Sequence, residues 1–245
     1  MLLLLSYYFV LIILKLTAHL FFMVAPYNKG DEYEDKIFRI LRDSKQVPEG
    51  FERAGAGDRP DIVFLHSGKP HNLEVKNALT VDFGQKMLRW SADKKWYWSE
   101  DDKITQLYTG LGVLDAINNK NIVPIKFNRP NKEITPTDKK ADQNAFKARI
   151  DIPFETLVKY YNEKGIFYIQ IGTGFGFYHL GKDMANLGTP AFIATLSLRL
   201  RAKTLHTSPP SAYAFLAVLK PKTKPQISKF SLEKNSKQKF PPIQP

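Results

Sequence analysis

The sequence of 245 residues contains no cysteine, which excludes a disulfide framework and a zinc site built on thiolates. Its five histidines do not cluster, and their spacing is not that of a metal site. Acidic residues are also few relative to basic ones, 24 against 36, so the formal net charge is +12. Such an excess favours contacts with phosphate, which depend on salt rather than on sequence.

The positive charge is concentrated near the C-terminus. From Arg199 onward there are ten lysines and arginines against one acidic residue, Glu233, a net charge of +9. Residues 220–245 mix lysine, proline and polar residues without a burial pattern, so we expect a basic disordered tail there. This tail serves either to contact phosphate or only to keep the chain soluble.

Residues 1–22 are almost wholly apolar and are interrupted by Lys15 and His19. The segment lacks the basic start and the small-residue cleavage site of a secretory signal. It is either a membrane anchor or the product of an upstream start codon. We expect Met23 to be the native start, which predicts a cytoplasmic protein; the alternative is a protein anchored in the membrane through residues 1–22.

Two apolar segments, residues 61–65 and 72–76, are predicted to form neighbouring strands joined by a turn. Asp61 stands at the start of the first strand, and Glu74 and Lys76 lie in the second. Because side chains alternate along a strand, Glu74 and Lys76 point to the same side, and the hairpin brings Asp61 and Glu74 within reach of one ion. Two carboxylates and a substrate phosphate are sufficient for Mg²⁺, which keeps several water ligands.

A helix is predicted ahead of these strands, over residues 31–42, where Glu34, Ile37 and Leu41 share one face. A carboxylate on an apolar face requires a partner. Residues 51–54 are predicted to form a short strand, from which a glycine-containing segment leads to the strand pair.

These positions together resemble the PD-(D/E)XK nuclease superfamily, over roughly residues 30–127. The matched positions are Glu34 on the first helix, Pro60-Asp61, Glu74-x-Lys76 and Gln85. Gly30-x-x-x-Glu34, with Arg53 ahead of the Pro-Asp pair, also looks like the archaeal Holliday-junction resolvases within that superfamily.

The resemblance implies a role for each matched residue. Asp61 and Glu74 would ligate Mg²⁺, or Mn²⁺ in its place, and Lys76 would be the catalytic lysine. Glu34 would assist at the metal or orient a second ion, and Gln85 would contact the substrate backbone or steady the site. The implied fold is a restriction-endonuclease-like core, an αβββαβ mixed sheet flanked by helices.

We therefore expect an α/β protein with this core over residues 23–128 and a C-terminal α+β extension over residues 129–219. A helix over residues 102–118 and a strand over residues 122–127 would complete the mixed sheet of the core. The polar residues 128–143 are predicted to form a long loop.

The extension is predicted to contain a helix, a hairpin and two further strands, at residues 153–162, 167–178, 191–200 and 213–219. Three glycines at the turn of the hairpin form a Gly-x-Gly-x-Gly pattern, but the helix that a dinucleotide site needs is not predicted after them. We therefore expect a turn there and no small-molecule cofactor. Substrate discrimination is expected to lie in this half of the chain.

Four basic residues are candidates for nucleic-acid contacts. Arg53 and Arg59 precede the strand pair, and Lys94 and Lys95 lie within an aromatic cluster that spans residues 90–98. Aromatic side chains beside lysines can stack on bases. We favour packing against the core as the role of these aromatics, because tryptophan is a large hydrophobe.

The sequence thus predicts a Mg²⁺-dependent endonuclease of the restriction or defence type that acts on duplex DNA. The resemblance also implies a homodimer, because cutting both strands usually takes two active sites. A Holliday-junction resolvase is the first alternative, and RNA is an alternative substrate. A catalytically inactive DNA-binding protein on the same scaffold is the alternative from another class.

Overall fold

The structure is a computed structural model, and it describes residues 29–53, 59–128, 134–204, 213–234 and 239–244. The expectations for residues 1–22 and for a start at Met23 fall outside these ranges. In the described part of the chain, no helix is both long enough and apolar enough to cross a membrane.

Strands and helices are both present along the described part of the chain. The strands are β1 (Ile62–His66), β2 (Lys69–Lys76), β3 (Gln85–Trp90), β4 (Trp96–Trp98), β5 (Ala148–Ile152), β6 (Ile166–Ile171), β7 (Gly176–His179), β8 (Leu196–Thr204) and β9 (Tyr213–Pro221). The helices are α2 (Lys29–Asp43), α3 (Lys103–Gly110), α4 (Val113–Asn118), α5 (Ile125–Asn128), α6 (Pro136–Ala145) and α7 (Glu155–Glu163).

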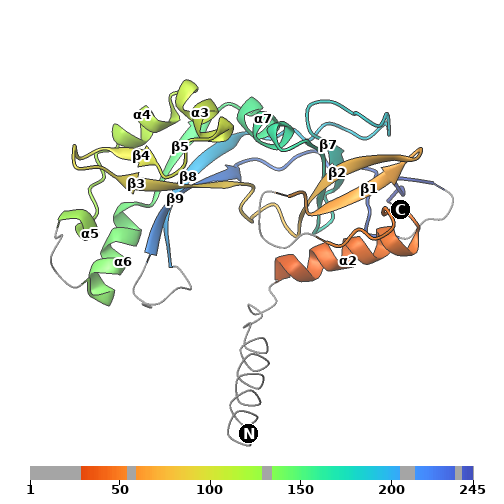
Figure 1. Ribbon diagram of the computed structural model, residues 1–245, viewed down its shortest axis with the longest axis horizontal. Coiled ribbons are helices and arrows are strands. Elements are labelled where there is room, and N and C mark those ends of the chain that lie inside the picture. The colour runs from red at the N-terminus through yellow and green to blue at the C-terminus, as the bar shows by residue number, and fades with distance from the viewer. Residues whose placement is uncertain (1–28, 54–58, 129–133, 205–212, 235–238, 245) are drawn as a thin grey trace, which may run out of the picture.

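The protein has a mixed α/β fold with two sheets. A four-stranded sheet has the order β1-β2-β6-β7, and a five-stranded sheet has the order β4-β3-β9-β8-β5. Figure 1 shows the two sheets side by side, with α2 along the four-stranded sheet and α7 near the junction between them. The α/β class predicted from the sequence is therefore confirmed.

The expected hairpin of β1 and β2 is present. It turns at Ser67 and Gly68, whose φ angles are both positive, 49° and 73°. A two-residue turn of this kind matches the twist of the flanking strands. Apolar side chains of α2, among them Ile37 and Leu41, pack against one face of this sheet.

The mixed sheet is completed by a later part of the chain than predicted. β2 pairs in parallel with β6, and α7 directly precedes β6 and contacts it. We expected a helix over residues 102–118 and a strand over residues 122–127 in these roles, and that assignment was wrong. A parallel connection can have any length above about a dozen residues, so local patterns do not indicate which helix and strand return to the sheet.

Residues 77–154 contribute instead to the five-stranded sheet. β3 pairs with β9, and β5 pairs with β8, so strands from the predicted core and from the predicted extension lie in one sheet. The predicted boundary between residues 128 and 129 therefore does not separate the two sheets.

Three short helices, α3, α4 and α5, replace a predicted long helix and the strand predicted over residues 122–127. Gly112 has a φ angle of 71° and separates α3 from α4. The Asp142 carboxylate accepts hydrogen bonds from the backbone N–H groups of Ile125 and Lys126, at 2.5 and 3.0 Å. A carboxylate bound to the first amides of a segment stabilises a helix start, which explains why α5 is not a strand.

Two other local predictions also differ from the structure. α6 occupies part of the segment predicted to be a loop, and it begins at a capping box formed by Thr135 and Asp138. Residues 51–53 form no strand, and the last residue of that prediction lies outside the described ranges. Phe51 packs instead against Phe38 of α2, with ring centroids 6.3 Å apart.

The C-terminal segment is packed against the protein. Phe230 and Leu232 are 5% and 1% exposed and belong to the same apolar cluster as α2. Phe230 also forms a β-bridge with Ile243. The disorder predicted for residues 220–245 is therefore wrong for those that the structure describes, because a few buried apolar side chains anchor an otherwise polar segment.

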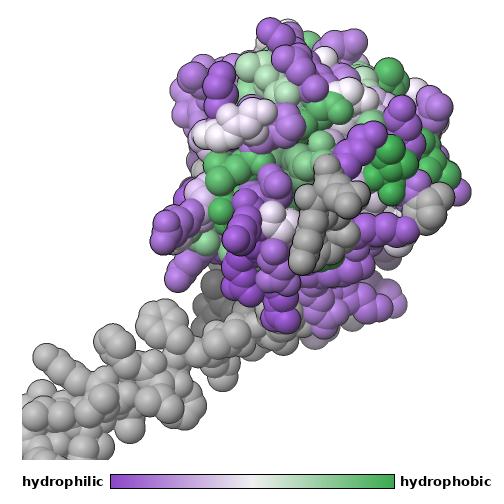
Figure 2. Space-filling model, turned by 90° about the vertical axis from the view of Figure 1, so that its right-hand side faces the viewer, coloured by the Kyte–Doolittle hydropathy of each residue, from purple (hydrophilic) through white to green (hydrophobic). Residues whose placement is uncertain are grey.

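A second apolar cluster fills the space between the five-stranded sheet and the helices α3, α4 and α7. Trp96 is 2% exposed and packs against Phe146 and Phe215, with ring centroids 4.8 and 5.1 Å apart. Trp90 and Trp98 also pack against this cluster, whereas Tyr97 is 43% exposed. The packing role expected for the aromatic residues is thus confirmed for the three tryptophans and wrong for Tyr97. At the end of the molecule that carries the four-stranded sheet, the surface is largely hydrophilic, with apolar patches broken up by polar residues (Figure 2).

Candidate active site

A cleft of about 330 Å³ is lined by residues of β2 and α7, by residues at the starts of α2 and β3, and by the segment before β1. Seven of the residues predicted to act at the site line this cleft, namely Glu34, Arg53, Arg59, Asp61, Glu74, Lys76 and Gln85. Lys94 and Lys95, in contrast, lie in the connection between β3 and β4 and do not line the cleft.

Asp61 and Glu74 are neighbours because of the register of the hairpin. Ile62 of β1 pairs with Leu73 of β2, so the next residues outward, Asp61 and Glu74, lie side by side. Asp61 Oδ2 accepts a hydrogen bond from the Val75 backbone N–H at 2.8 Å. This bond holds the carboxylate against the second strand.

Lys76 points to the same side of β2 as Glu74, and its Nζ forms an ion pair with Glu74 Oε1. The two side chains are only 16% and 11% exposed. Burial lowers the pKa of Lys76, but the carboxylates Glu74 and Asp61 outweigh burial, and the pKa is raised above its ordinary value. Lys76 is therefore a fixed cation at neutral pH.

Glu34 reaches the cleft from α2. Ile37 and Leu41, which share its helix face, are 0% and 2% exposed, so this face lies against the sheet. Arg53 Nη1 lies 2.7 Å from Glu34 Oε2 and is the partner that a carboxylate on an apolar face requires. Burial raises the pKa of Glu34 despite the opposing effects of Lys76 and Arg53.

The centre of the cleft carries an excess of negative charge. Three carboxylates, on Glu34, Asp61 and Glu74, face two cations, Lys76 and Arg53, so the group has a net charge of −1 when all five are ionised. Burial first, and then repulsion by Glu74, raise the pKa of Asp61 to about 7. A divalent cation would supply the missing positive charge.

The donor chemistry of the cleft fits Mg²⁺, which prefers carboxylate oxygens. Within the described ranges, no group of three or more histidine or carboxylate side chains forms a ready-made metal cage. Mg²⁺ does not depend on such a cage, since one or two carboxylates together with substrate phosphate and water commonly hold it.

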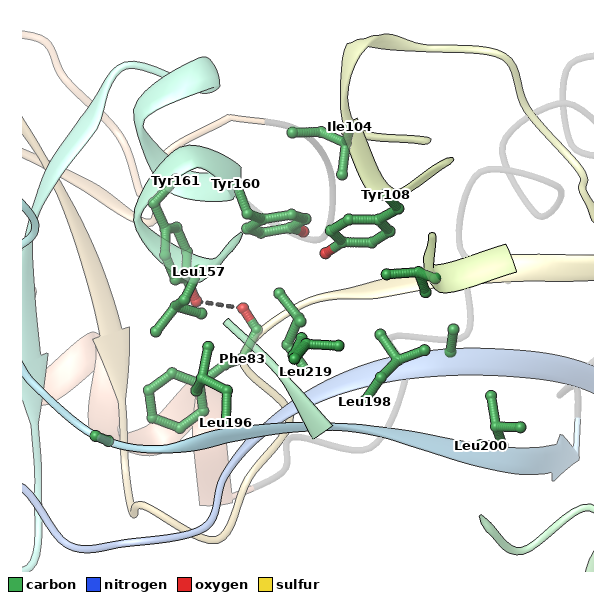
Figure 3. Close-up of a cluster of buried hydrophobic side chains, with 14 of the residues drawn as sticks. Phe83, Ile104, Tyr108, Leu157, Tyr160, Tyr161, Leu196, Leu198, Leu200 and Leu219 are labelled. Atoms are coloured by element: carbon green, nitrogen blue, oxygen red, sulfur yellow. Dashed lines mark hydrogen bonds between the residues drawn. The ribbon is translucent and has the colours of Figure 1, made fainter. Parts of the chain in front are cut away.

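Two tyrosines of α7 form part of the cleft wall, and no local sequence pattern indicated them. The Tyr161 hydroxyl donates a hydrogen bond to the Phe83 carbonyl oxygen and lies 3.3 Å from Glu74 Oε1, 87 residues away in the chain. Figure 3 shows Tyr161 pointing toward Phe83, with Tyr160 beside it. Tyr160 fits closely over Gly84, where an added Cβ would lie 2.7 Å from the Tyr160 Cζ atom.

Comparisons with known proteins add no relative: no protein-family model, no curated protein and no solved structure matches the chain. The residues of the cleft are therefore the evidence for what the protein does.

Proposed function

We propose that the protein is a Mg²⁺-dependent endonuclease that hydrolyses phosphodiester bonds in duplex DNA, as a restriction or defence enzyme does. The observation that carries this proposal is the convergence of Asp61, Glu74 and Lys76 in one cleft. Two adjacent carboxylates with a buried lysine, in a pocket of net negative charge, suit metal-assisted hydrolysis of a phosphodiester.

The order of the elements around the cleft supports the same proposal. α2, β1, β2, α7 and β6 follow one another as helix, strand, strand, helix and strand, and β2 and β6 are parallel. This arrangement differs from the expected αβββαβ core because residues 51–53 form no strand, and it supports a restriction-endonuclease-like core that keeps the two strands of the site, with residues 77–154 inserted between the second of them and the crossover helix.

Five residues of the cleft have a chemical role in this proposal. Asp61 and Glu74 would hold Mg²⁺, with Glu34 beside them, and the bound ion would activate a water molecule and polarise the phosphate. Lys76 is already protonated, so it orients the water and stabilises the charge that develops on the phosphate, and it does not act as the base. Arg59 lies along the same cleft, where it can contact a backbone phosphate.

The test is a cleavage assay on plasmid DNA, linear duplex and four-way junctions, with Mg²⁺, Mn²⁺ or EDTA. We expect the wild type to cut plasmid and duplex only when a divalent ion is present. Lys76→Ala should lower the cleavage rate roughly a hundredfold or more, because it removes a preorganised cation from the phosphate. Lys69→Ala, at the exposed opposite end of β2, is the matched control and should cut like the wild type.

The other outcomes are equally specific. Preferential symmetric cutting of junctions would assign the protein to junction resolution. Cleavage unchanged by Lys76→Ala would remove this cleft as the site, and DNA binding without cleavage by the wild type would indicate a binding protein on the same scaffold. Thermal unfolding of each variant shows whether a lower cleavage rate results from a loss of folded protein.

A further inference from the structure

The five-stranded sheet has one apolar face and one face on which basic side chains surround a small buried apolar cluster of β9, formed by Ala214, Leu216 and Val218. Every second residue of β8 is a leucine, at positions Leu196, Leu198 and Leu200. These leucines point to the same side of the sheet as Tyr108 and Tyr160 and belong to the apolar cluster beneath the helices (Figure 3). Side chains at the positions between them point to the other side, which we call the outer face. The strand register places six basic residues on the outer face, namely Arg89, Arg149, Arg199, Arg201, Lys203 and Lys220.

Two arginines of the outer face stand directly opposite each other. Arg149 of β5 is the cross-strand partner of Arg199 of β8. Like charges in this position, with Cβ atoms about 5 Å apart, destabilise a sheet unless an anion lies between them. Asp151 on the same face is engaged by Lys222 at 2.8 Å, and in the described part of the chain no carboxylate forms an ion pair with either arginine.

The same two arginines line a groove of about 320 Å³. Three lysines, Lys220, Lys222 and Lys224, complete its charged lining, and no acidic side chain is among the described residues that line it. Lys220 and Lys222 form ion pairs with Asp82 and Asp151, so among the described residues Arg149, Arg199 and Lys224 are the cations of the groove without a carboxylate partner. This remaining positive charge suits a ligand that carries several negative charges at regular spacing, which is the chemistry of a nucleic-acid backbone.

The outer face is continuous with the catalytic cleft. Gln85 lines the cleft and is also on the outer face, as the cross-strand partner of Val218. Asp82, another residue of the cleft wall, binds both Arg201 and Lys220, each at 3.0 Å. Three strand spacings separate β3 from β5, about 14 Å, which corresponds to about four base pairs of a duplex.

We propose that the outer face, centred on Arg149 and Arg199, binds the phosphate backbone of the same DNA duplex whose scissile bond enters the cleft, at a point about four base pairs beyond the edge of the cleft at β3. The inference rests on the proposed nuclease function and names how that site holds its substrate. A phosphate bound between the two arginines would neutralise the like-charged pair. The contacts would position DNA without selecting its sequence.

The test is DNA affinity in EDTA, where no divalent ion supports cleavage, measured by the fluorescence anisotropy of a labelled duplex. The variant Arg149→Gln/Arg199→Gln should bind about tenfold more weakly or worse, and the slope of log affinity against log salt should fall by about 2 between about 50 and 200 mM NaCl. Lys103→Gln/Lys120→Gln removes the same charge from exposed sites on α3 and just after α4, beyond the opposite face of the sheet. This control should keep both affinity and slope.

The arginine variant should unfold at no lower temperature than the wild type, because two like charges in contact are removed, so weaker binding would not be a loss of fold. Affinity and salt slope equal to those of the wild type, in a protein that cleaves DNA, would overturn the inference and leave the nuclease proposal standing.

Two further results separate the remaining readings. If the wild type binds DNA through the two arginines but does not cleave it, the outer face is supported and the nuclease proposal fails. Vesicles of anionic lipid are a third binding partner in the test. If the wild type binds vesicles but not DNA, and the arginine variant loses vesicle binding, the outer face binds a membrane surface and the inference is overturned.

Discussion

Among single residues, Asp61 is the one at which stability and the proposed activity oppose each other. Its carboxylate is buried next to that of Glu74, and its pKa is raised to about 7. Because the folded protein then holds this proton more tightly than the unfolded chain, the contribution of Asp61 to the stability of the metal-free protein falls as the pH rises from about 4 to 7. The charge that costs stability is the one that a cation would use.

Asp61→Asn should therefore stabilise the metal-free protein near pH 8 by roughly 2 kcal/mol, since the amide keeps an acceptor for the Val75 N–H but carries no charge. Mg²⁺ should raise the unfolding midpoint of the wild type and leave that of the variant unchanged. Urea unfolding with EDTA or Mg²⁺ measures both effects. Asp93→Asn, at an exposed site between β3 and β4, is the control. If Asp61→Asn is less stable than the wild type near pH 8, the charge of Asp61 does not destabilise the folded protein.

The hydroxyl group of Tyr161 leads to a second prediction for a single residue. Tyr161→Phe leaves the buried Phe83 carbonyl oxygen without its donor and should lower the free energy of unfolding by about 1–2 kcal/mol. Tyr160→Phe, one residue earlier on the same helix, should change it by less than about 0.5 kcal/mol. Chemical denaturation measures the free energy of unfolding of both variants. A loss in Tyr161→Phe no larger than that in Tyr160→Phe would contradict a stabilising role for the Tyr161 hydroxyl bond.

The helices and strands differ in how far their own residues determine their secondary structure. The β1–β2 hairpin could be predicted because strand pattern and turn lie within a few residues of each other. α5 could not, because the carboxylate that stabilises its first amides belongs to Asp142, in another helix. Asp142 is 1% exposed and also accepts a hydrogen bond from the Tyr213 hydroxyl, so it joins α5, α6 and β9.

Asp142→Ala should accordingly be severe. It leaves three donors without their acceptor, the N–H groups of Ile125 and Lys126 and the hydroxyl of Tyr213, and should cost about 3 kcal/mol or more. Asp115→Ala, at an exposed site in the first turn of α4, should cost no more than about 1 kcal/mol. Guanidinium unfolding followed by circular dichroism measures both, and similar losses in the two variants would refute this role for Asp142.

The whole molecule is organised by pairings between distant parts of the chain. β2 pairs in parallel with β6 across more than a third of the sequence, and β3 pairs antiparallel with β9 across more than half of it. The C-terminal segment then returns to the four-stranded sheet and buries Phe230 and Leu232 beside α2. The cleft lies where these long-range pairings bring the two sheets together.

The packing of the C-terminal segment leads to a prediction for the whole fold. Leu232→Ala should lower the free energy of unfolding by about 2–5 kcal/mol, because the side chain is 1% exposed in an apolar cluster. Ile227→Ala, at a site 67% exposed in the same segment, should have an effect below about 0.5 kcal/mol. Denaturant unfolding distinguishes the two, and a Leu232→Ala protein as stable as the wild type would mean that the segment does not hold the fold.

Most of the candidate site was predictable because its parts are close in sequence. Asp61, Glu74 and Lys76 belong to one hairpin, and strand alternation alone sets the side to which Glu74 and Lys76 point. Tyr161 and the outer face were not predictable, since they depend on which distant strands and helices pack together. The disorder predicted for the tail failed for the same reason, because Phe230 and Leu232 have apolar partners only in the folded protein.

By itself, the sequence determined the charge of the protein, the hairpin and the clustering of two carboxylates and a lysine on it. These follow from composition and from rules that act over a few residues, where backbone geometry leaves little choice. Only the tertiary structure decided which strands complete each sheet, that α7 closes the cleft, and that a basic face continues from it. Burial of apolar surface between distant segments selects those pairings, and their partners cannot be identified from any local pattern.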